Sequence, residues 1–95
     1  MPFVNTSQRW PLTSPIWNEV PAVYGVMDAN GRIIYIGETD NIKRRMAEHL
    51  ADRTHKMHLY RPVSACVEVI RTGQVARLAR ERALILEYDP PANHS

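Results

Sequence analysis

The chain has 95 residues, a net charge of +2 and one cysteine. This length supports one small domain with a single core. No apolar run approaches the roughly 18 residues of a membrane span, and no signal-peptide pattern opens the chain, so we expect a cytoplasmic protein without a membrane partner. Cys66 cannot form an internal disulfide, and its alternating apolar surroundings predict a packed side chain rather than redox chemistry.

Residues 1–20 are predicted to form an N-terminal arm, and residues 21–95 the folded domain. The prolines that interrupt regular structure in and after the arm are Pro2, Pro11, Pro15 and Pro21. Trp10, Ile16 and Trp17 are too large and apolar to be exposed without a reason, so the arm is expected to cover apolar surface. The alternative is that a tryptophan stacks on a nucleic-acid base.

Asn30-Gly31, between two apolar runs, predicts a β-hairpin of residues 22–28 and 32–38. Both residues accept the positive φ of a two-residue type I′ turn, which would set Ala29 opposite Arg32. That register pairs Val26 with Tyr35 and Tyr24 with Gly37.

Strand side chains alternate between faces, so Tyr24, Tyr35 and Gly37 would share one face with Val26. The two phenols would then be neighbours, and Gly37 would leave space opposite Tyr24. A slip of one residue would undo this arrangement. The opposite face is apolar enough to face the core, and its side chains are Val23, Met27, Ile34 and Ile36.

A helix is predicted next, capped by Thr39 or Asp40 and ending near Arg53. Arg45 and His49 are four residues apart and would share a helical face. The buried stripe would consist of Ile42, Met46 and Leu50.

The rest of the chain predicts a third strand and a second helix. Residues 63–70 alternate as a strand does, and Gly73 ends that pattern. Gln74 to about Tyr88 is helical in pattern and is followed by Asp89-Pro90-Pro91. The order strand, strand, helix, strand, helix indicates a small α+β domain whose short sheet is covered by helices.

Glu81 falls within the apolar face of the second predicted helix, among side chains expected to point inward: Val75, Leu78, Ala79, Leu84, Ile85 and Tyr88. A buried, uncompensated carboxylate costs several kcal/mol or becomes protonated, so Glu81 needs a cation or a strong donor. An arginine of the first helix and a divalent metal both meet that need.

The positive charge is concentrated in residues 40–61, which suits a polyanion such as nucleic acid but also an ordinary solvated surface. Within it, Arg45 can pair with Glu81 or bind a phosphate, and His49 can pack, bind phosphate or carry a proton. His55 and His58 raise a structural zinc alternative, although the paired ligand motifs of strong zinc sites are lacking.

The ordered set of motifs resembles the GIY-YIG nuclease family over about residues 22–93. Val23-Tyr24 matches the end of the first tripeptide that names the family, and Tyr35-Ile36-Gly37 matches the second in full. Residues 39–45 resemble the polar turn that leads to the family's arginine, with His49 one helical turn further on. The closing block of the family is matched by Glu81, Leu84-Ile85, Pro90 and Asn93.

The resemblance implies a three-stranded antiparallel sheet flanked by helices, in the order β-β-α-β-α, and metal-dependent endonuclease activity on the phosphodiester bonds of DNA. It implies that Glu81 holds a single divalent cation, magnesium or manganese, and that Arg45 stabilises the phosphoryl charge. Nucleic-acid contacts are expected from Gly37 and from the basic segment: Lys43, Arg44, Arg53, Lys56, His58 and Arg61.

By the same resemblance, Tyr24 would activate the attacking water, and Tyr35 would orient the water or the phosphate. A free phenol has a pKa of about 10, so either tyrosine would need the metal or Arg45 nearby to act as a base. His49 would bind the scissile phosphate or relay a proton, and Asn93 would order the site near Glu81.

The chain departs from the family pattern at two positions. Ala22 stands for the first glycine, and Glu38 stands where many relatives carry lysine. A second carboxylate would repel a phosphate unless it binds metal or points away. Glu38 therefore favours the alternative of a nucleic-acid-binding module that has lost cleavage, and a third hypothesis is a protein-interaction domain that uses its tryptophan arm.

The resemblance implies that relatives usually fuse this domain to a separate DNA-binding or repair module, whereas this chain is expected to be a stand-alone catalytic domain. Target selection would then depend on its own loops, its arm, a partner protein or a homodimer. The choice among DNA, RNA and branched DNA stays open.

Overall fold

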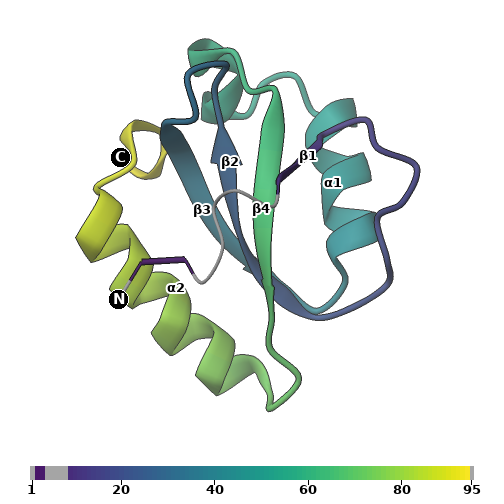
Figure 1. The fold of residues 1–95 in the computed structure, drawn as a ribbon, viewed down its shortest axis with the longest axis vertical. Helices are drawn as coiled ribbons and strands as arrows, with labels where there is room; N and C mark the ends of the chain where they lie inside the picture. The colour runs from purple at the N-terminus through teal and green to yellow at the C-terminus, as the bar shows by residue number, and fades with distance from the viewer. Residues whose placement is uncertain (1, 4–8, 95) are drawn as a thin grey trace.

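The computed structural model describes residues 2–3 and 9–94, and it places a twisted sheet between two helices (Figure 1). In chain order the elements are the strands and helices β1 Arg9–Pro11, β2 Ala22–Met27, β3 Ile33–Thr39, α1 Ile42–Ala51, the 3₁₀ helix η1 Lys56–Tyr60, β4 Ser64–Val69, α2 Gln74–Tyr88 and the 3₁₀ helix η2 Pro91–Asn93. The α+β class, the order of the main elements and the bounds of the second helix agree with the sequence prediction.

Over the described residues, the antiparallel sheet has four strands, in the order β1-β4-β2-β3, rather than the three expected. The additional strand, β1, comes from the arm and pairs with the first half of β4, from Arg9 opposite Cys66 to Pro11 opposite Ser64. Proline lacks an N–H group and is tolerated on an edge strand, which is where β1 lies. Pro11, the last residue of β1, is thus compatible with this strand.

The arm covers part of the core, as expected, but not with all three of its large side chains. Leu12 is buried, and Trp17 packs against the same cluster and donates from Nε1 to the Leu12 carbonyl at 3.1 Å. Trp10 is half-buried and contacts the Trp17 ring edge-on. The prediction was wrong for Ile16, which is 58% exposed.

The hairpin loop differs from the predicted two-residue turn. Gly31 has a φ of 79°, but Asn30 has no positive φ, and Gly31 N–H donates to the Asp28 carbonyl at 3.0 Å. Asp28 and Arg32 close the loop, and the Asp28 carboxylate accepts from the N–H groups of Asn30 and Arg32 at 2.9 and 3.0 Å. Such a three-residue loop needs positive φ only at its glycine.

A β-bulge restores the predicted register within the strands. Met27 pairs with Ile33 and Val26 with Tyr35, so Ile34 is the extra residue of the bulge. Tyr24 therefore lies opposite Gly37, as predicted. The bulge also turns Ile34 to the same side as Tyr24, so its predicted place on the opposite face was wrong.

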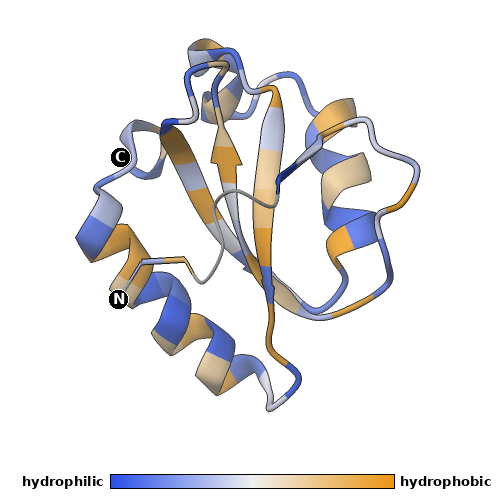
Figure 2. Cartoon of the chain, viewed as in Figure 1, coloured by the Kyte–Doolittle hydropathy of each residue, from blue (hydrophilic) through white to orange (hydrophobic). Residues whose placement is uncertain are grey.

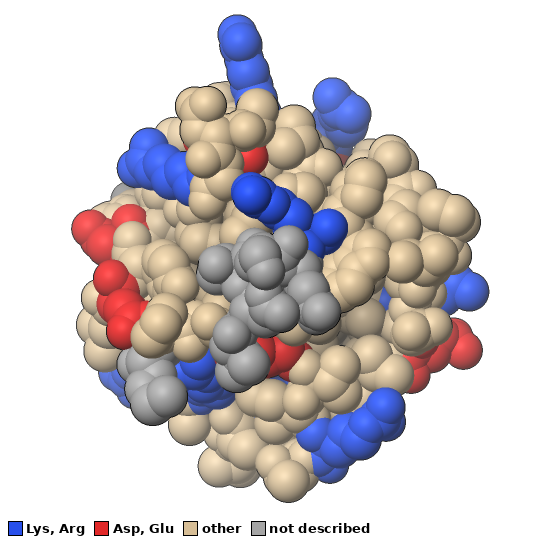
Figure 3. Space-filling model, viewed as in Figure 1, with Lys and Arg blue, Asp and Glu red and all other residues tan. Residues whose placement is uncertain are grey.

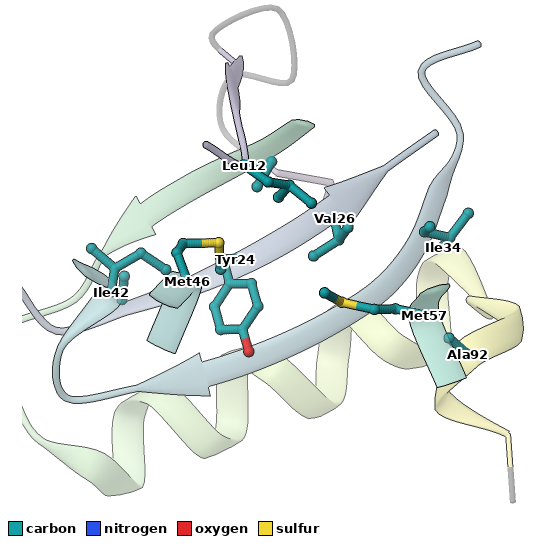
Figure 4. Close-up of a cluster of buried hydrophobic side chains, with 10 residues drawn as sticks. Leu12, Tyr24, Val26, Ile34, Ile42, Met46, Met57 and Ala92 are labelled. Atoms are coloured by element: carbon teal, nitrogen blue, oxygen red, sulfur yellow. The ribbon is translucent and has the colours of Figure 1, made fainter. Parts of the chain in front are cut away.

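Both faces of the sheet are buried, whereas the sequence predicted only one core side. The side chains packed on the α1 side, which we call the α1 face, include Tyr24, Val26, Ile34, Met46 and Met57 (Figure 4). The α2 face carries a second cluster, formed by Phe3, Val23, Met27, Ile33, Ile36, Cys66 and Leu84. Apolar residues accordingly follow the strands between the two helices (Figure 2).

Helix α1 is capped by Asn41, one residue after Asp40 and two after Thr39, the two predicted caps. Asn41 Oδ1 accepts from the Arg44 N–H at 3.0 Å, while Thr39 Oγ1 accepts from the Asn41 N–H at 3.0 Å. Ile42 and Met46 are buried as expected, but Leu50 is half-buried, and His49 is 1% exposed.

Helix α2 buries apolar side chains only in its second half. Leu84 is buried and packs with Ile85 and Tyr88, whereas Val75 is 84% exposed. Leu78 and Ala79 are exposed as well, so the predicted inward stripe was wrong in the first half of α2. There, Arg77 is the buried residue.

Cys66 belongs to the core on the α2 face. Cys66 is buried, and its burial raises the pKa of the thiol to about 11, in agreement with the packed role predicted from the sequence. In the described part of the chain, no helix is both long and apolar enough to cross a membrane.

Candidate active site

Tyr24 lies at the centre of the candidate site, on β2 opposite Gly37 of β3. Figure 4 shows its side chain extending from β2 toward β3. A Cβ atom at position 37 would collide with the Tyr24 hydroxyl and lie 2.6 Å from the ring carbon that carries it. The ring therefore occupies the space that the sequence predicted beside Gly37, and any larger residue would displace it.

A buried hydrogen bond of 2.7 Å joins the Tyr24 hydroxyl to Nε2 of His49 on α1. Burial, with smaller contributions from Arg45 and His55, lowers the pKa of His49 to about 3, so the imidazole is neutral at physiological pH. Burial and then the neighbouring Tyr35 raise the pKa of Tyr24, so the phenol keeps its proton. Tyr24 consequently donates and His49 accepts.

Tyr35 completes this group and brings in a histidine whose role the sequence did not predict. The Tyr35 ring lies 6.2 Å from the ring of Tyr24, 5.7 Å from that of His49 and 4.6 Å from that of His55. His55 caps η1 by accepting the Met57 N–H on Nδ1 at 3.1 Å. The sequence places His55 in a charged loop, and only its capping position immediately before a turn could have indicated its orientation.

The zinc alternative is not supported by the arrangement of these histidines. His58 Nε2 donates to the backbone carbonyl of His49 at 2.8 Å. Within residues 2–3 and 9–94, no group of three or more histidine, cysteine or acidic side chains is arranged to hold a metal ion.

Arg45 is held between Glu48 and Tyr24. Its Nη1 donates to Glu48 Oε1 at 3.0 Å, and its guanidinium lies beside the Tyr24 hydroxyl, where it lowers the pKa of the phenol against the larger effect of burial. No ion pair between Arg45 and Glu81 is present among the described residues. The alternative that Arg45 forms a structural ion pair with Glu81 is therefore not supported.

Glu81 of α2 is a half-buried carboxylate, and none of the ion pairs within residues 2–3 and 9–94 includes it. Burial, and then the charge of Glu38, raise the pKa of Glu81, while the Glu38 backbone N–H donates to it. The Glu38 side chain points to Arg77, with Oε2 at 3.1 Å from Nε, and it receives a weaker contact from Gln74 at 3.5 Å. The carboxylate at the position of the family's lysine is thus ion-paired.

Asn93 of η2 holds the outer edge of β3 at Ile36. Its Oδ1 accepts from the Ile36 N–H at 2.8 Å, and its Nδ2 donates to the Ile36 carbonyl at 2.9 Å. Because Ile36 lies between Tyr35 and Gly37, this pair of hydrogen bonds fixes the strand segment that carries both residues.

A polar cavity of 420 Å³ opens beside Arg45, and its walls are formed by Glu38, Thr39, Asp40, Arg44, Arg45, Glu48, Gln74 and Arg77. Arg44, predicted to contact nucleic acid, is paired with Asp40 there. Tyr24 and Glu81 do not line this cavity, so it adjoins the aromatic group instead of enclosing it.

Of the other predicted nucleic-acid contacts, Arg53, His58 and Arg61 line one cavity, which Lys43 and Lys56 do not line. Lys43, Arg53 and Arg61 are exposed, whereas His58 is turned toward His49 and Lys56 donates to the His94 carbonyl. On the face shown in Figure 3, lysine and arginine side chains lie apart from one another.

Comparison with known proteins decides the family. The model of the GIY-YIG catalytic domain matches residues 20–94. The chain belongs to the GIY-YIG family. The match extends over β2 to η2 and thus over every residue of the candidate site.

Relatives of this GIY-YIG domain include UvrABC system protein C of Methylococcus capsulatus, which is 48% identical over 77 residues, and that of Porphyromonas gingivalis, which is 30% identical over 83 residues. The aligned parts cover 77% and 83% of this chain, but only 12% and 14% of those proteins. The relatives are therefore much longer than the region shared.

A solved structure has the same fold. It is the N-terminal GIY-YIG endonuclease domain of UvrC from Thermotoga maritima, bound to magnesium as its catalytic divalent cation. The TM-score is 0.72 at 25% sequence identity, and the superposition covers 83% of this chain and 89% of that domain. The predicted family and fold class are confirmed, while the roles of individual residues stay predictions.

Proposed function

We propose that this GIY-YIG domain is a metal-dependent endonuclease that hydrolyses phosphodiester bonds in DNA. The observation that carries the proposal is the buried Tyr24–His49 hydrogen bond, with the Arg45 guanidinium beside the same hydroxyl. A packing role alone does not require a tyrosine, a neutral histidine and an arginine to meet at one buried oxygen. Tyr24 and His49 can transfer a proton between them, and the Arg45 guanidinium beside them can bind a phosphate.

Glu81 is the residue proposed to hold the divalent cation. Burial and then the negative charge of Glu38 raise the pKa of the half-buried Glu81 carboxylate, so a bound cation would relieve an unfavourable environment. Magnesium suits a site with one protein carboxylate because it retains several waters. When bound, the cation supplies positive charge to the phosphoryl group and to the attacking oxygen.

Arg45 is proposed to bind the scissile phosphate. Its guanidinium offers several N–H donors in a fixed geometry that matches phosphate oxygens. Glu48 occupies one of these donors at 3.0 Å, and the Arg45 side chain is 32% exposed. A phosphate that enters the adjoining cavity can therefore replace Glu48 without displacing buried structure.

Tyr24 and His49 are proposed to remove the proton of the attacking water. A free phenolate is unfavourable at this buried position. Tyr24 avoids it by passing its own proton to His49 Nε2 as it receives the proton of the water. His49 gains a positive charge in this step, and the negative charge that develops on the phosphoryl group offsets part of the cost. Tyr35 would orient the water at the half-buried rim.

Asn93 is proposed to maintain this geometry from outside the reacting group. Its two hydrogen bonds to Ile36 hold the strand on which Tyr35 and Gly37 lie. Since Gly37 accommodates the Tyr24 ring, a shift of β3 would move both tyrosines.

The test is cleavage of supercoiled plasmid by the purified chain with magnesium or manganese. We expect nicking by the parent and a loss of about 100-fold or more in Glu81→Gln and Arg45→Ala, since each removes a charge that acts on the transition state. Glu87→Gln and Arg82→Ala, both at exposed positions of α2, are the matched controls. Equal cutting by Glu81→Gln and the parent would contradict the proposal.

Glu38 favours a second candidate function, a module that binds nucleic acid without cutting it. Its carboxylate adds negative charge near Glu81, where a phosphate would approach. In that case binding would weaken with salt, but no product would form with any divalent ion. Assays on plasmid, single-stranded DNA, branched DNA and RNA would also identify the preferred substrate.

Targeting by a partner protein or by a second copy of the chain is proposed as well. The relatives are named as protein C of a UvrABC system, which is consistent with work alongside other components. Removal of residues 1–20 tests the arm: loss of a partner with cleavage retained would assign the arm to that interaction.

A further inference from the structure

Two arginine–glutamate pairs connect α2 to the sheet on either side of the same β2 residue. Val23 lies opposite Glu38 of β3 and opposite Glu68 of β4. Arg77 binds Glu38 at 3.1 Å, and Arg80, three residues further along α2, binds Glu68 at 2.8 Å. The pairs are equivalent in chemistry and in their place relative to β2, so they provide an internal comparison.

The pairs differ in what surrounds them. Arg80 also donates to the carbonyl of Pro2 at 2.7 Å and thereby joins the N-terminal segment to α2. The pair of Arg77 and Glu38 lies at the candidate site, where the Glu38 backbone N–H donates to the Glu81 carboxylate. The two side chains are only 9% and 14% exposed, so solvent screens this pair weakly.

Arg77 and Glu81 are one helical turn apart on α2, and both approach Glu38. Helix α2 thus presents two charged side chains to β3, the Arg77 guanidinium and the Glu81 carboxylate. Of the two, Arg77 forms the ion pair with Glu38. Without Arg77, two carboxylates would share this place. Paired carboxylates attract a divalent cation more strongly than one does, and they repel a phosphate.

We propose that Arg77 is a positioning residue, which binds the Glu38 carboxylate and so prevents it from joining Glu81 as a second ligand of the cation. Glu38 and Arg77 both line the cavity that leads to Arg45, so their pairing also removes net negative charge from the path of the phosphate. This inference rests on the proposed nuclease function, and it explains how a chain with a glutamate at position 38 can retain a phosphate site.

The experiment compares Arg77→Gln with the matched variant Arg80→Gln. Binding of Mn²⁺ without DNA is measured by electron paramagnetic resonance of the free ion, and KM and kcat are measured for DNA nicking. We expect Arg77→Gln to bind Mn²⁺ about tenfold more tightly and to show a KM for DNA raised about tenfold, since one added charge near a cation is worth roughly 1 kcal/mol or more. Arg80→Gln is expected to change neither value.

The variant with both Glu38→Gln and Arg77→Gln provides the rescue. It removes the freed carboxylate, so Mn²⁺ affinity and KM are expected to return close to the parent values. Thermal unfolding separates this role from a purely structural one: Arg77→Gln and Arg80→Gln are both expected to lower Tm, yet only Arg77→Gln tightens Mn²⁺ binding.

Unchanged Mn²⁺ affinity in a folded Arg77→Gln variant would overturn the inference. If that variant does not fold, Glu38→Gln alone decides: retained Mn²⁺ affinity supports the inference, and weakened affinity overturns it, because Glu38 would then be a ligand. Failure of the parent to nick DNA with any divalent ion would instead contradict the proposed function, which keeps the two outcomes separate.

Discussion

The α1 face and the α2 face of the sheet contribute different chemistry to the same site. On the α1 face, Tyr24 and His49 are uncharged, buried and joined by a hydrogen bond of 2.7 Å. On the α2 face, Glu38 and Arg77 are charged and paired, and Glu81 beside them is a carboxylate whose pKa is raised. Burial favours neutral groups on the first face, and ion pairing retains charge on the second.

Under the proposed function, the α1 side would supply the Tyr24–His49 proton relay and the phosphate-binding Arg45, and the α2 side would supply the carboxylate that holds the divalent cation. Burial holds Tyr24 and His49 in their neutral forms, so a proton can pass between them when a compensating charge develops nearby, whereas a carboxylate that holds a cation must be ionised. Gly37 and Glu38, neighbours on β3, form the junction between the faces, because Gly37 leaves room for the Tyr24 ring on the α1 face and Glu38 carries an ion pair on the α2 face. Four experiments test this difference between the two faces.

The largest effect is expected from Tyr24→Phe on the α1 face. The change removes the hydroxyl that connects water to His49, so cleavage should fall by about 100-fold or more. It also leaves His49 Nε2 buried without its partner, so stability should fall by about 1–3 kcal/mol. Plasmid nicking and denaturant unfolding measure the two effects. Tyr60→Phe, at an exposed position, should match the parent in both, and a fully active Tyr24→Phe would contradict a proton relay.

The next effect tests the junction between the faces through two strand glycines. Gly37→Ala places a Cβ against the Tyr24 ring and should lower cleavage per folded molecule by roughly 10-fold, with a stability loss of about 1–3 kcal/mol. Gly25→Ala places its Cβ 2.7 Å from the Phe3 ring on the α2 face, away from the tyrosines. A similar loss of stability with full activity is expected there. Equal loss of activity in both variants would show that packing alone controls the site.

The two faces should respond to acid with opposite sign. His49 has a pKa near 3 when folded and about 6.5 when unfolded, so its contribution to stability is complete above pH 6.5 and is lost as the pH falls toward 3. The pKa of Glu81 is raised by folding, so its contribution is present below its unfolded value and is lost as the pH rises through its folded value. Tm measured between pH 4 and 8 should therefore fall less steeply on acidification in His49→Gln, and more steeply in Glu81→Gln, than in the parent. Parallel curves for all three proteins would contradict the assigned shifts.

The smallest effect concerns Glu48, which competes with phosphate for Arg45. Glu48→Gln should tighten DNA binding about two- to fivefold, because a partly exposed ion pair is worth less than about 1 kcal/mol. Fluorescence anisotropy with labelled DNA measures the change, and Glu19→Gln, in the exposed arm, is the control. Weaker binding by Glu48→Gln would show that Glu48 orients Arg45 for the phosphate.

Much of the framework could be predicted from local patterns. Helix α2 has the predicted bounds because Gly73 and Asp89-Pro90 mark its ends. The predicted pairing of Tyr24 with Gly37 was also correct, although the prediction missed two features of the hairpin that compensate for each other. The loop is one residue longer than predicted, and the bulge at Ile34 offsets that residue. Alternation along a strand indicates a face but does not reveal a bulge.

What could not be predicted depends on contacts between distant residues. The pairing of Arg77 with Glu38 joins positions 39 residues apart, and the sequence pattern places no buried arginine on α2. The fourth strand requires β4 as a partner, so the proline-rich arm gives no local indication of it. His55 enters the site only because η1 turns it toward Tyr35.

The Asn93 contact with Ile36 also bears on how the site is assembled. Fifty-seven residues separate these partners, whereas the β2–β3 hairpin is local and can form early. The strand that carries Tyr35 thus gains its outer clamp only after α2 has been made and has docked. On a ribosome, Tyr24 and Tyr35 would be synthesised well before the contact that fixes them, so under the proposed function the growing chain would contain both tyrosines of the site before it could cut DNA.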